Sequence, residues 1–220
     1  MILFVLLFAG ISYLLGSIPF SYLAGRILKG VDLRQHGSGN LGATNTYRML
    51  GFWPAFIVGL LDAAKGFLPV HFFPALVLAG AHLYGQNHSL VMGTKLEMVL
   101  MIAMALASIA GHVWTLFLGF RGGKGVTTAF GAFVAIAPLA TSAALLVWII
   151  VLALGRKVSI ASLSAAVVYP IFLLLLKKDL LKSELLLFCF SLVVCALVVY
   201  THRANIARLI RGEEKDIKER

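Results

Sequence analysis

The sequence has few charged residues for its length. Of its 220 residues, 13% are Asp, Glu, Lys or Arg and 60% are hydrophobic, whereas a soluble domain has about 25% charged residues. This shortage argues against a soluble globular domain and predicts an integral membrane protein. Because every lipid-exposed backbone group must be hydrogen-bonded internally, we expect an all-α membrane protein.

Acidic residues and cysteines are scarcer still. Asp and Glu together number 9 against 19 Lys and Arg, and Asp32 is the only acid in the segments that we place in the cytoplasm before the C-terminal tail. This argues against a carboxylate-bound metal ion and against paired-carboxylate catalysis, so we predict no metal and no cofactor. Cys189 and Cys195 fall on different faces of one apolar helix, which argues against a disulfide.

The net charge of +10 does not indicate a nucleic-acid partner, because the basic residues fall between apolar runs. Arg26, Lys29 and Arg34 follow the first run, so the positive-inside rule places the N-terminus outside and the C-terminus in the cytoplasm. Apolar segments long enough for membrane helices, or nearly so, predict seven transmembrane helices at 2–24, 52–73, 96–118, 125–137, 139–154, 160–176 and 185–200.

Three details refine this topology. Gly16, Ser17 and Pro19 predict a bend in the first helix, and Pro138 divides a long apolar run into two short helices. We expect a polar loop at 30–50, an external excursion at 74–95 and an external loop at 177–184. Asp62 and Lys65, three apart in the second span, are expected to form a structural ion pair.

A basic, glycine-rich loop precedes the short helix that begins near residue 125. Residues 119–128 read GFRGGKGVTT, in which Gly122, Gly123 and Gly125 permit close approach of a ligand to the backbone and Lys124 supplies a cation. A helix N-terminus with a lysine beside it attracts anions, so we predict a phosphate site here. The alternative is a glycine-rich connector whose charges only mark the cytoplasmic side.

Four polar segments fall on the predicted cytoplasmic face. They read HGSGNLGATNTYR, GFRGGKGVTT, RKVSIAS and YTHRANIAR, and each combines cations with small hydrogen-bonding side chains, as expected for a substrate with one or two phosphates and a hydroxyl. A Walker loop is excluded, because Leu118 and Gly125 stand where it needs Gly and Ser or Thr. The neutral donors are Ser38, Asn40, Thr44, Asn45, Ser159 and Asn205, and the cations are Arg48, Lys124, Arg203 and Arg208.

The segments GSGNLGATN (37–45), GFRGGKG (119–125) and HRANI (202–206) resemble those of the bacterial acylphosphate-dependent glycerol-3-phosphate acyltransferases, the PlsY family. The resemblance spans nearly the whole chain. It implies a single domain over 1–212 with a charged cytoplasmic tail at 213–220, located in the bacterial inner membrane with its active site facing the cytoplasm. It also implies transfer of an acyl group from acyl phosphate to the 1-hydroxyl of glycerol 3-phosphate, giving lysophosphatidic acid and phosphate in the first step of phospholipid synthesis.

The resemblance also implies roles for individual residues. In the third motif His202 and Asn205 match, whereas Ala204 stands where the family often has Glu, so a structural carboxylate there must come from a neighbour. The attacking hydroxyl gives its proton either to His202 or to a substrate phosphate. The catalytic set is Ser38, Lys124, His202 and Asn205, and the substrate-binding set is Asn40, Thr44, Asn45, Arg48, Gly122, Gly123, Gly125, Ser159 and Arg203.

Two other functional classes fit parts of the pattern. A transporter or flippase for a phosphorylated or lipid substrate would use the same basic loops, but it would be expected to show repeated halves and mid-membrane polar residues. A structural membrane subunit would leave the clustered Ser, Thr and Asn residues unexplained. We expect acyl phosphate, glycerol 3-phosphate and membrane lipid as partners, and no nucleic acid or obligate protein partner.

Overall fold

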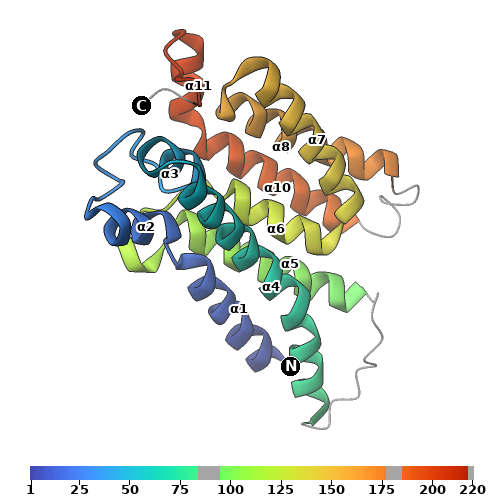
Figure 1. Cartoon of the computed structure of the whole chain (residues 1–220). Coiled ribbons are helices and arrows are strands. Elements are labelled where there is room, and N and C mark those ends of the chain that lie inside the picture. The colour runs from blue at the N-terminus through green and yellow to red at the C-terminus, as the bar shows by residue number, and fades with distance from the viewer. Residues whose placement is uncertain (84–94, 177–184, 218–220) are drawn as a thin grey trace. The chain divides into compact units, whose positions relative to one another are not determined.

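The computed structural model describes residues 1–83, 95–176 and 185–217. All regular secondary structure in these ranges is helical (Figure 1), as the composition predicts. The helices are α1 (Ile2–Ser17), α2 (Phe20–Lys29), α3 (Ala43–Leu50), α4 (Phe52–Leu83), α5 (Lys95–Val113), η1 (Leu116–Leu118), α6 (Val126–Ile136), α7 (Pro138–Gly155), α8 (Val158–Leu176), α10 (Leu185–Thr201) and α11 (Arg203–Ile210).

Five stretches of the described chain are long and apolar enough to cross a membrane, or six if α10 and α11 count as one bent span. The five are Ile2–Lys29, Phe52–Leu83, Lys95–Leu118, Pro138–Gly155 and Val158–Leu176. The predicted short helix is present as α6, whose 11 residues rise only about 16 Å and cannot cross a bilayer alone. The described chain is therefore an all-helical membrane protein with five to six candidate spans.

Proline positions explain where the apolar runs divide. The predicted bend in the first helix is confirmed, since Ile18 and Pro19 separate α1 from α2. The predicted division at Pro138 is also confirmed, because Pro138 occupies the first turn of α7, where its missing N–H costs no hydrogen bond. By contrast, Pro69 and Pro74 lie inside α4, as membrane helices tolerate.

Three predicted irregular segments differ in the structure. The expected loop at 30–50 contains α3, and the basic C-terminal segment contains α11. Residues 74–83 of the predicted external excursion are helical and continue α4 without a break, so the predicted end of the second span at residue 73 is wrong. The rest of that segment, 84–94, and the predicted loop 177–184 lie outside the described residues.

The helices group into two compact units that interleave along the chain. The first unit contains residues 1–20 and 59–136, and its helices touch through glycines. A Cβ on Gly16 would lie 2.1 Å from the Ser108 carbonyl oxygen of α5, and a Cβ on Gly131 of α6 would lie 1.9 Å from the Ala63 carbonyl oxygen of α4. Small residues thus allow the backbones to approach closely, as in other membrane helix pairs.

The second unit contains residues 21–58 and 137–220. In it α8 packs against both α7 and α10, and the Trp148 indole of α7 donates a hydrogen bond to the Ser162 hydroxyl of α8 at 3.2 Å. The short helices α2 and α3 are joined by a 2.8 Å hydrogen bond between the hydroxyls of Ser21 and Thr46. The predicted single domain over 1–212 stays a prediction.

Candidate phosphate-binding site

The glycine loop in the first unit is bound tightly to the end of α5. The Gly122 amide donates to the Val113 carbonyl and the Gly123 amide to the His112 carbonyl, each at 3.0 Å. A Cβ on Gly122 would lie 2.0 Å from the His112 carbonyl oxygen, so only glycine fits here. Both N–H groups are thus already bonded within the protein, and a phosphate at this loop meets Lys124 and the amides that follow it.

The loop then turns into α6 at Gly125. Gly125 has a φ of 79°, in the left-handed region that favours glycine, and its carbonyl accepts the Ala129 amide at 2.8 Å. The amides of the first turn of α6 have no intrahelical carbonyl to bind, and the positive end of the helix dipole lies there. Lys124 is half-buried immediately before this turn, so a cation and a helix N-terminus are placed together as the sequence predicts.

In the second unit, Asn45 organises the first motif. Its side-chain oxygen accepts the Ser38 amide at 2.9 Å, and its nitrogen donates to the carbonyls of Leu33 at 3.0 Å and His36 at 3.1 Å. Gly37, with φ of 63°, has no room for a Cβ beside the Asn45 side chain. Asn45 therefore shapes the loop, which leaves the Ser38 side chain exposed. Of the remaining predicted residues, Thr44 is half-buried in the first turn of α3, and Asn40 is half-buried in the loop before it.

A salt bridge closes the other end of this loop. The Arg34 guanidinium donates to both carboxylate oxygens of Asp32, at 3.0–3.1 Å from Nε and 2.7 Å from Nη2. These hydrogen bonds lower the pKa of Asp32 to about 2, although its burial acts in the opposite direction. The same pairing raises the pKa of Arg34. The acid in this loop is thus held as an ion by its own arginine.

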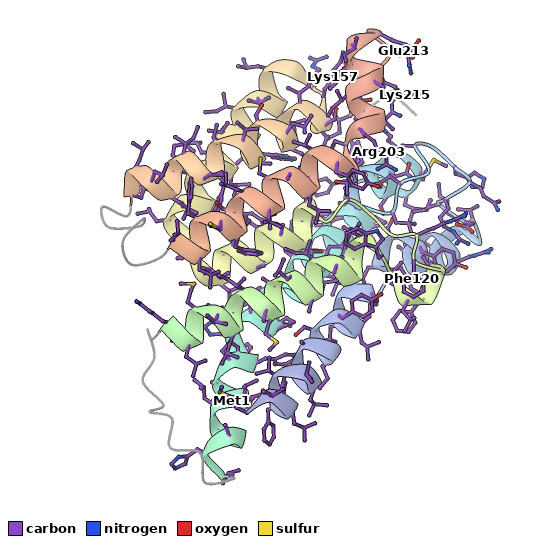
Figure 2. All side chains as sticks on the ribbon, turned by 180° about the vertical axis from the view of Figure 1, so that it is seen from behind. Met1, Phe120, Lys157, Arg203, Glu213 and Lys215 are labelled. Carbon is purple, nitrogen blue, oxygen red and sulfur yellow. The ribbon has the colours of Figure 1, made fainter. Side chains whose placement is uncertain are left out.

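Arg48 extends from α3 to the C-terminal segment. Its Nη2 donates to the Asp216 carbonyl at 3.0 Å and the Lys215 carbonyl at 3.4 Å. The same segment is tied to the loop between α7 and α8, since the Ile217 amide donates to the Arg156 carbonyl at 2.9 Å. Figure 2 labels Lys215 in this segment, which follows α11. The segment predicted as a charged tail therefore belongs to the folded unit as far as residue 217.

Glu214 joins two of the predicted site residues. The Asn205 side chain donates to its Oε1 at 2.6 Å, and Arg208 Nε donates to its Oε2 at 2.8 Å. Burial raises the pKa of Glu214, but the hydrogen bonds from Asn205 and Arg208 help to offset it, and the pKa lies below its usual range. Ala204, where the family often carries Glu, is exposed, and the carboxylate beside Asn205 comes from Glu214 instead.

Sequence reasoning missed Glu214 because a charge in a terminal segment is usually solvated. One signal was available in Gly212, which follows α11 with φ of 72°. A glycine directly after a helix commonly reverses the chain, and here the Glu213 amide donates back to the Arg208 carbonyl at 2.8 Å. Such a turn returns the next residues toward the helix that precedes it.

His202 is buried at the junction of α10 and α11. Its Nδ1 lies 2.8 Å from the Val198 carbonyl oxygen, which can only accept a hydrogen bond, so Nδ1 carries the proton and Nε2 is the basic nitrogen of the neutral ring. Arg203 is exposed, and its guanidinium lies 4.5 Å from the centre of the Tyr200 ring. The two neighbours thus differ, since the histidine is held within the fold and the arginine lies on its surface.

Each of the two units therefore contains some of the predicted site residues. The first holds Gly122 to Gly125 at the start of α6, and the second holds Arg48, Ser159 and Asn205 against residues 214–216. Within the described ranges, no three His, Cys, Asp or Glu side chains gather in a way that could hold a metal ion. The predicted site residues are mostly cations and neutral hydrogen-bond donors, which suit the binding of phosphate esters.

Comparisons with known proteins agree with this chemistry. A family model described as glycerol-3-phosphate acyltransferase matches residues 6–212. The glycerol-3-phosphate acyltransferase of Chlorobium phaeobacteroides is 38% identical, and that of Prochlorococcus marinus strain MIT 9215 is 40% identical, with 94% of this chain and 94–95% of each relative covered. The chain is also similar to a crystal structure of PlsY (YgiH), an integral membrane glycerol 3-phosphate acyltransferase, in its glycerol 3-phosphate form. The TM-score is 0.78 and the sequence identity 37%, over 96% of this chain and 94% of that chain. Its lysophosphatidic acid form gives 0.75.

Proposed function

This chain belongs to the glycerol-3-phosphate acyltransferase family, as its motifs predict, and we propose that its acyl donor is an acyl phosphate. The acceptor is the 1-hydroxyl of glycerol 3-phosphate, and the products are lysophosphatidic acid and inorganic phosphate. This is the first committed acylation of phospholipid synthesis. A similar structure holds glycerol 3-phosphate and another holds lysophosphatidic acid, which supports the acceptor and the product.

The observation that supports this donor is the balance of charges in the polar segments. Asp32 is engaged by Arg34, and Glu214 by Arg208 and Asn205, so these acids are committed to arginines rather than offered to a metal. Over the whole chain 19 Lys and Arg stand against 9 Asp and Glu, and an excess of cations suits substrates that carry phosphate groups. An acyl phosphate is already activated and its phosphate is a good leaving group, so the protein needs only to position two anions and stabilise developing charge.

In the proposed reaction, the glycerol oxygen forms a bond to the acyl carbonyl carbon as the bond from that carbon to the phosphate oxygen breaks. Phosphate leaves with the electron pair. The hydroxyl proton passes to a phosphate oxygen of a substrate, while His202 Nε2 accepts a hydrogen bond from the neighbouring 2-hydroxyl and so orients the 1-hydroxyl for attack. Lys124 and the first turn of α6 bind a substrate phosphate, as do Arg48, Ser38 and Ser159.

The topology we propose has seven passes, with the N-terminus outside and the site on the cytoplasmic side of the bacterial inner membrane. It adds α10 and α6 to the five candidate spans. Because the 11 residues of α6 are too few to cross a full bilayer, this pass lies in a thinned or recessed part of the protein. The excess of Lys and Arg in the connecting segments 26–48, 121–124 and 156–157 and after residue 202 supports this orientation. The test is labelling, from either side of sealed vesicles, of single cysteines introduced at Arg121 and Arg211 in a protein whose Cys189 and Cys195 are replaced by Ala.

The reaction is tested with the purified full chain, a synthetic acyl phosphate and glycerol 3-phosphate. We expect lysophosphatidic acid and an equal amount of inorganic phosphate, and no product when acyl-coenzyme A replaces the acyl phosphate. Product from acyl-coenzyme A alone would overturn the donor assignment. Binding of glycerol 3-phosphate without any product would favour a transporter instead.

A further inference from the structure

The first unit contains a buried ion pair that the proposed reaction does not use. Asp62 and Lys65 of α4 lie 2.7 Å apart between Oδ1 and Nζ, and their side chains are 3% and 5% exposed. Lys65 Nζ also donates to the Ile18 carbonyl at 2.9 Å and lies over the Phe20 ring. The predicted structural ion pair is confirmed. Charges in a membrane span are costly to bury, so this pair calls for a reason beyond packing.

His112 connects this pair to the glycine loop. Its Nδ1 lies 3.6 Å from Asp62 Oδ1 and 3.1 Å from the Thr128 hydroxyl in the first turn of α6. Its backbone carbonyl accepts the Gly123 amide at 3.0 Å. One buried residue therefore contacts the chain on both sides of Lys124, through its backbone before the lysine and through its ring after it.

We propose that Asp62, His112 and Thr128 are positioning residues that hold Lys124 and the N-terminus of α6 in the geometry needed to bind a substrate phosphate. Lysine has a long, flexible side chain, and a glycine-rich backbone has little rigidity of its own. Fixing the loop before and after Lys124 supplies that rigidity before the substrate arrives. The ion pair with Lys65 holds the Asp62 side chain beside His112 Nδ1. The inference rests on the proposed acyl transfer.

Helix packing alone does not account for these contacts. The contact of α4 with α6 is already set by two glycines, since a Cβ on Gly66 would lie 2.0 Å from the Thr128 carbonyl and one on Gly131 would lie 1.9 Å from the Ala63 carbonyl. The hydroxyl of Thr128 and the ring of His112 are not needed for that approach. Their hydrogen bond adds a directional link to the loop, which is what a positioning role requires.

The test is a double-mutant cycle between Thr128 and Lys124. Thr128→Val removes the hydroxyl and keeps the shape, and we expect kcat to fall by about 10- to 100-fold, as small misplacements of binding groups do. Thr128→Ser restores the hydroxyl and is expected to restore most of the turnover. In a Lys124→Ala background, Thr128→Val should lower the residual turnover by less than about twofold, because it acts through the lysine that is already absent.

Thr141→Val is the matched control. It also removes a buried hydroxyl, which donates to the Ala137 carbonyl at 2.8 Å and lies beside the Tyr169 hydroxyl of α8. Since it does not contact the glycine loop, we expect kcat to stay within about twofold of the wild type. If Thr128→Val does not fold, His112→Leu enters the same cycle. An equal loss with and without Lys124, or a serine variant as slow as the valine variant, would overturn the inference. A wild-type protein without lysophosphatidic acid product would instead refute the proposed function.

Discussion

The Glu214 carboxylate accepts a hydrogen bond from the Asn205 side chain at 2.6 Å, across the turn that Gly212 makes after α11. The same carboxylate accepts a hydrogen bond from Arg208 at 2.8 Å. Two polar side chains of α11 therefore converge on one acid of the C-terminal segment. The segment serves as the support of the third motif, and its charges are part of the fold.

Replacement of this acid should destabilise the second unit. Glu214→Gln keeps the shape but leaves Arg208 without a charged partner, and we expect a loss of about 1–3 kcal/mol, seen as a lower melting temperature of the detergent-solubilised protein and a lower yield of lysophosphatidic acid. Glu213→Gln is the control, because Glu213 is 57% exposed and pairs with Arg211, which is itself exposed. A surface pair contributes at most about 1 kcal/mol. Equal effects of the two variants would contradict the supporting role of Glu214.

The Asp32–Arg34 ion pair predicts that the thermal stability of the protein falls at low pH. The pKa of Asp32 is lowered from 3.8 to about 2, so the fold favours the ionised form. Its contribution is complete above about pH 4 and is lost as the pH falls through 3.8 to about 2. We expect the difference in melting temperature between wild type and Asp32→Asn to be constant above about pH 4 and to disappear near pH 2. A difference that persists at the lowest pH would contradict the pairing.

Parts of the fold that depend on local chemistry could be predicted from the sequence. Pro138 marks the division between α6 and α7 because proline cannot continue a helix but fits its first turn. Asp62 and Lys65 could be paired because residues three apart share a helix face. The three motifs identified the family, which the comparisons confirm over residues 6–212.

Features that depend on tertiary contacts could not be predicted. α3 forms in a segment rich in Gly, Asn and Thr because Asn45 and Thr46 are buried there, which outweighs their weak helix propensity. α4 continues past Pro74 to Leu83, whereas the predicted span ends at residue 73. The sequence predicts Gly122 as part of a backbone site for phosphate, but it gives no sign of the close contact with the His112 carbonyl that the missing side chain allows.

That contact predicts a severe effect of a single methyl group. Gly122→Ala would place a Cβ 2.0 Å from the His112 carbonyl oxygen, and because the obstacle is backbone, the loop must move away from α5. We expect a loss of about 1–3 kcal/mol together with most of the acyltransferase activity. Gly155→Ala is the control, since no atom lies within 4 Å of its Cβ position. Its stability and its acyltransferase activity should match those of the wild type. Wild-type activity of Gly122→Ala would show that the loop is not held at this point.

The proton route predicts a modest effect at His202. Removal of a general base usually lowers turnover by 10²–10⁴-fold, but in our proposal the substrate phosphate takes the proton and His202 only orients the hydroxyl. His202→Gln should therefore lower kcat by less than about 100-fold, with an unchanged dependence of kcat on pH between about 6 and 8. The buried Nδ1 contact with Val198 at 2.8 Å also makes a structural loss expected, so the melting temperature is measured alongside. A well-folded His202→Gln protein that is about 1,000-fold slower, and has lost the pH dependence that the wild type shows near the pKa of histidine, would assign the proton to His202 Nε2 instead.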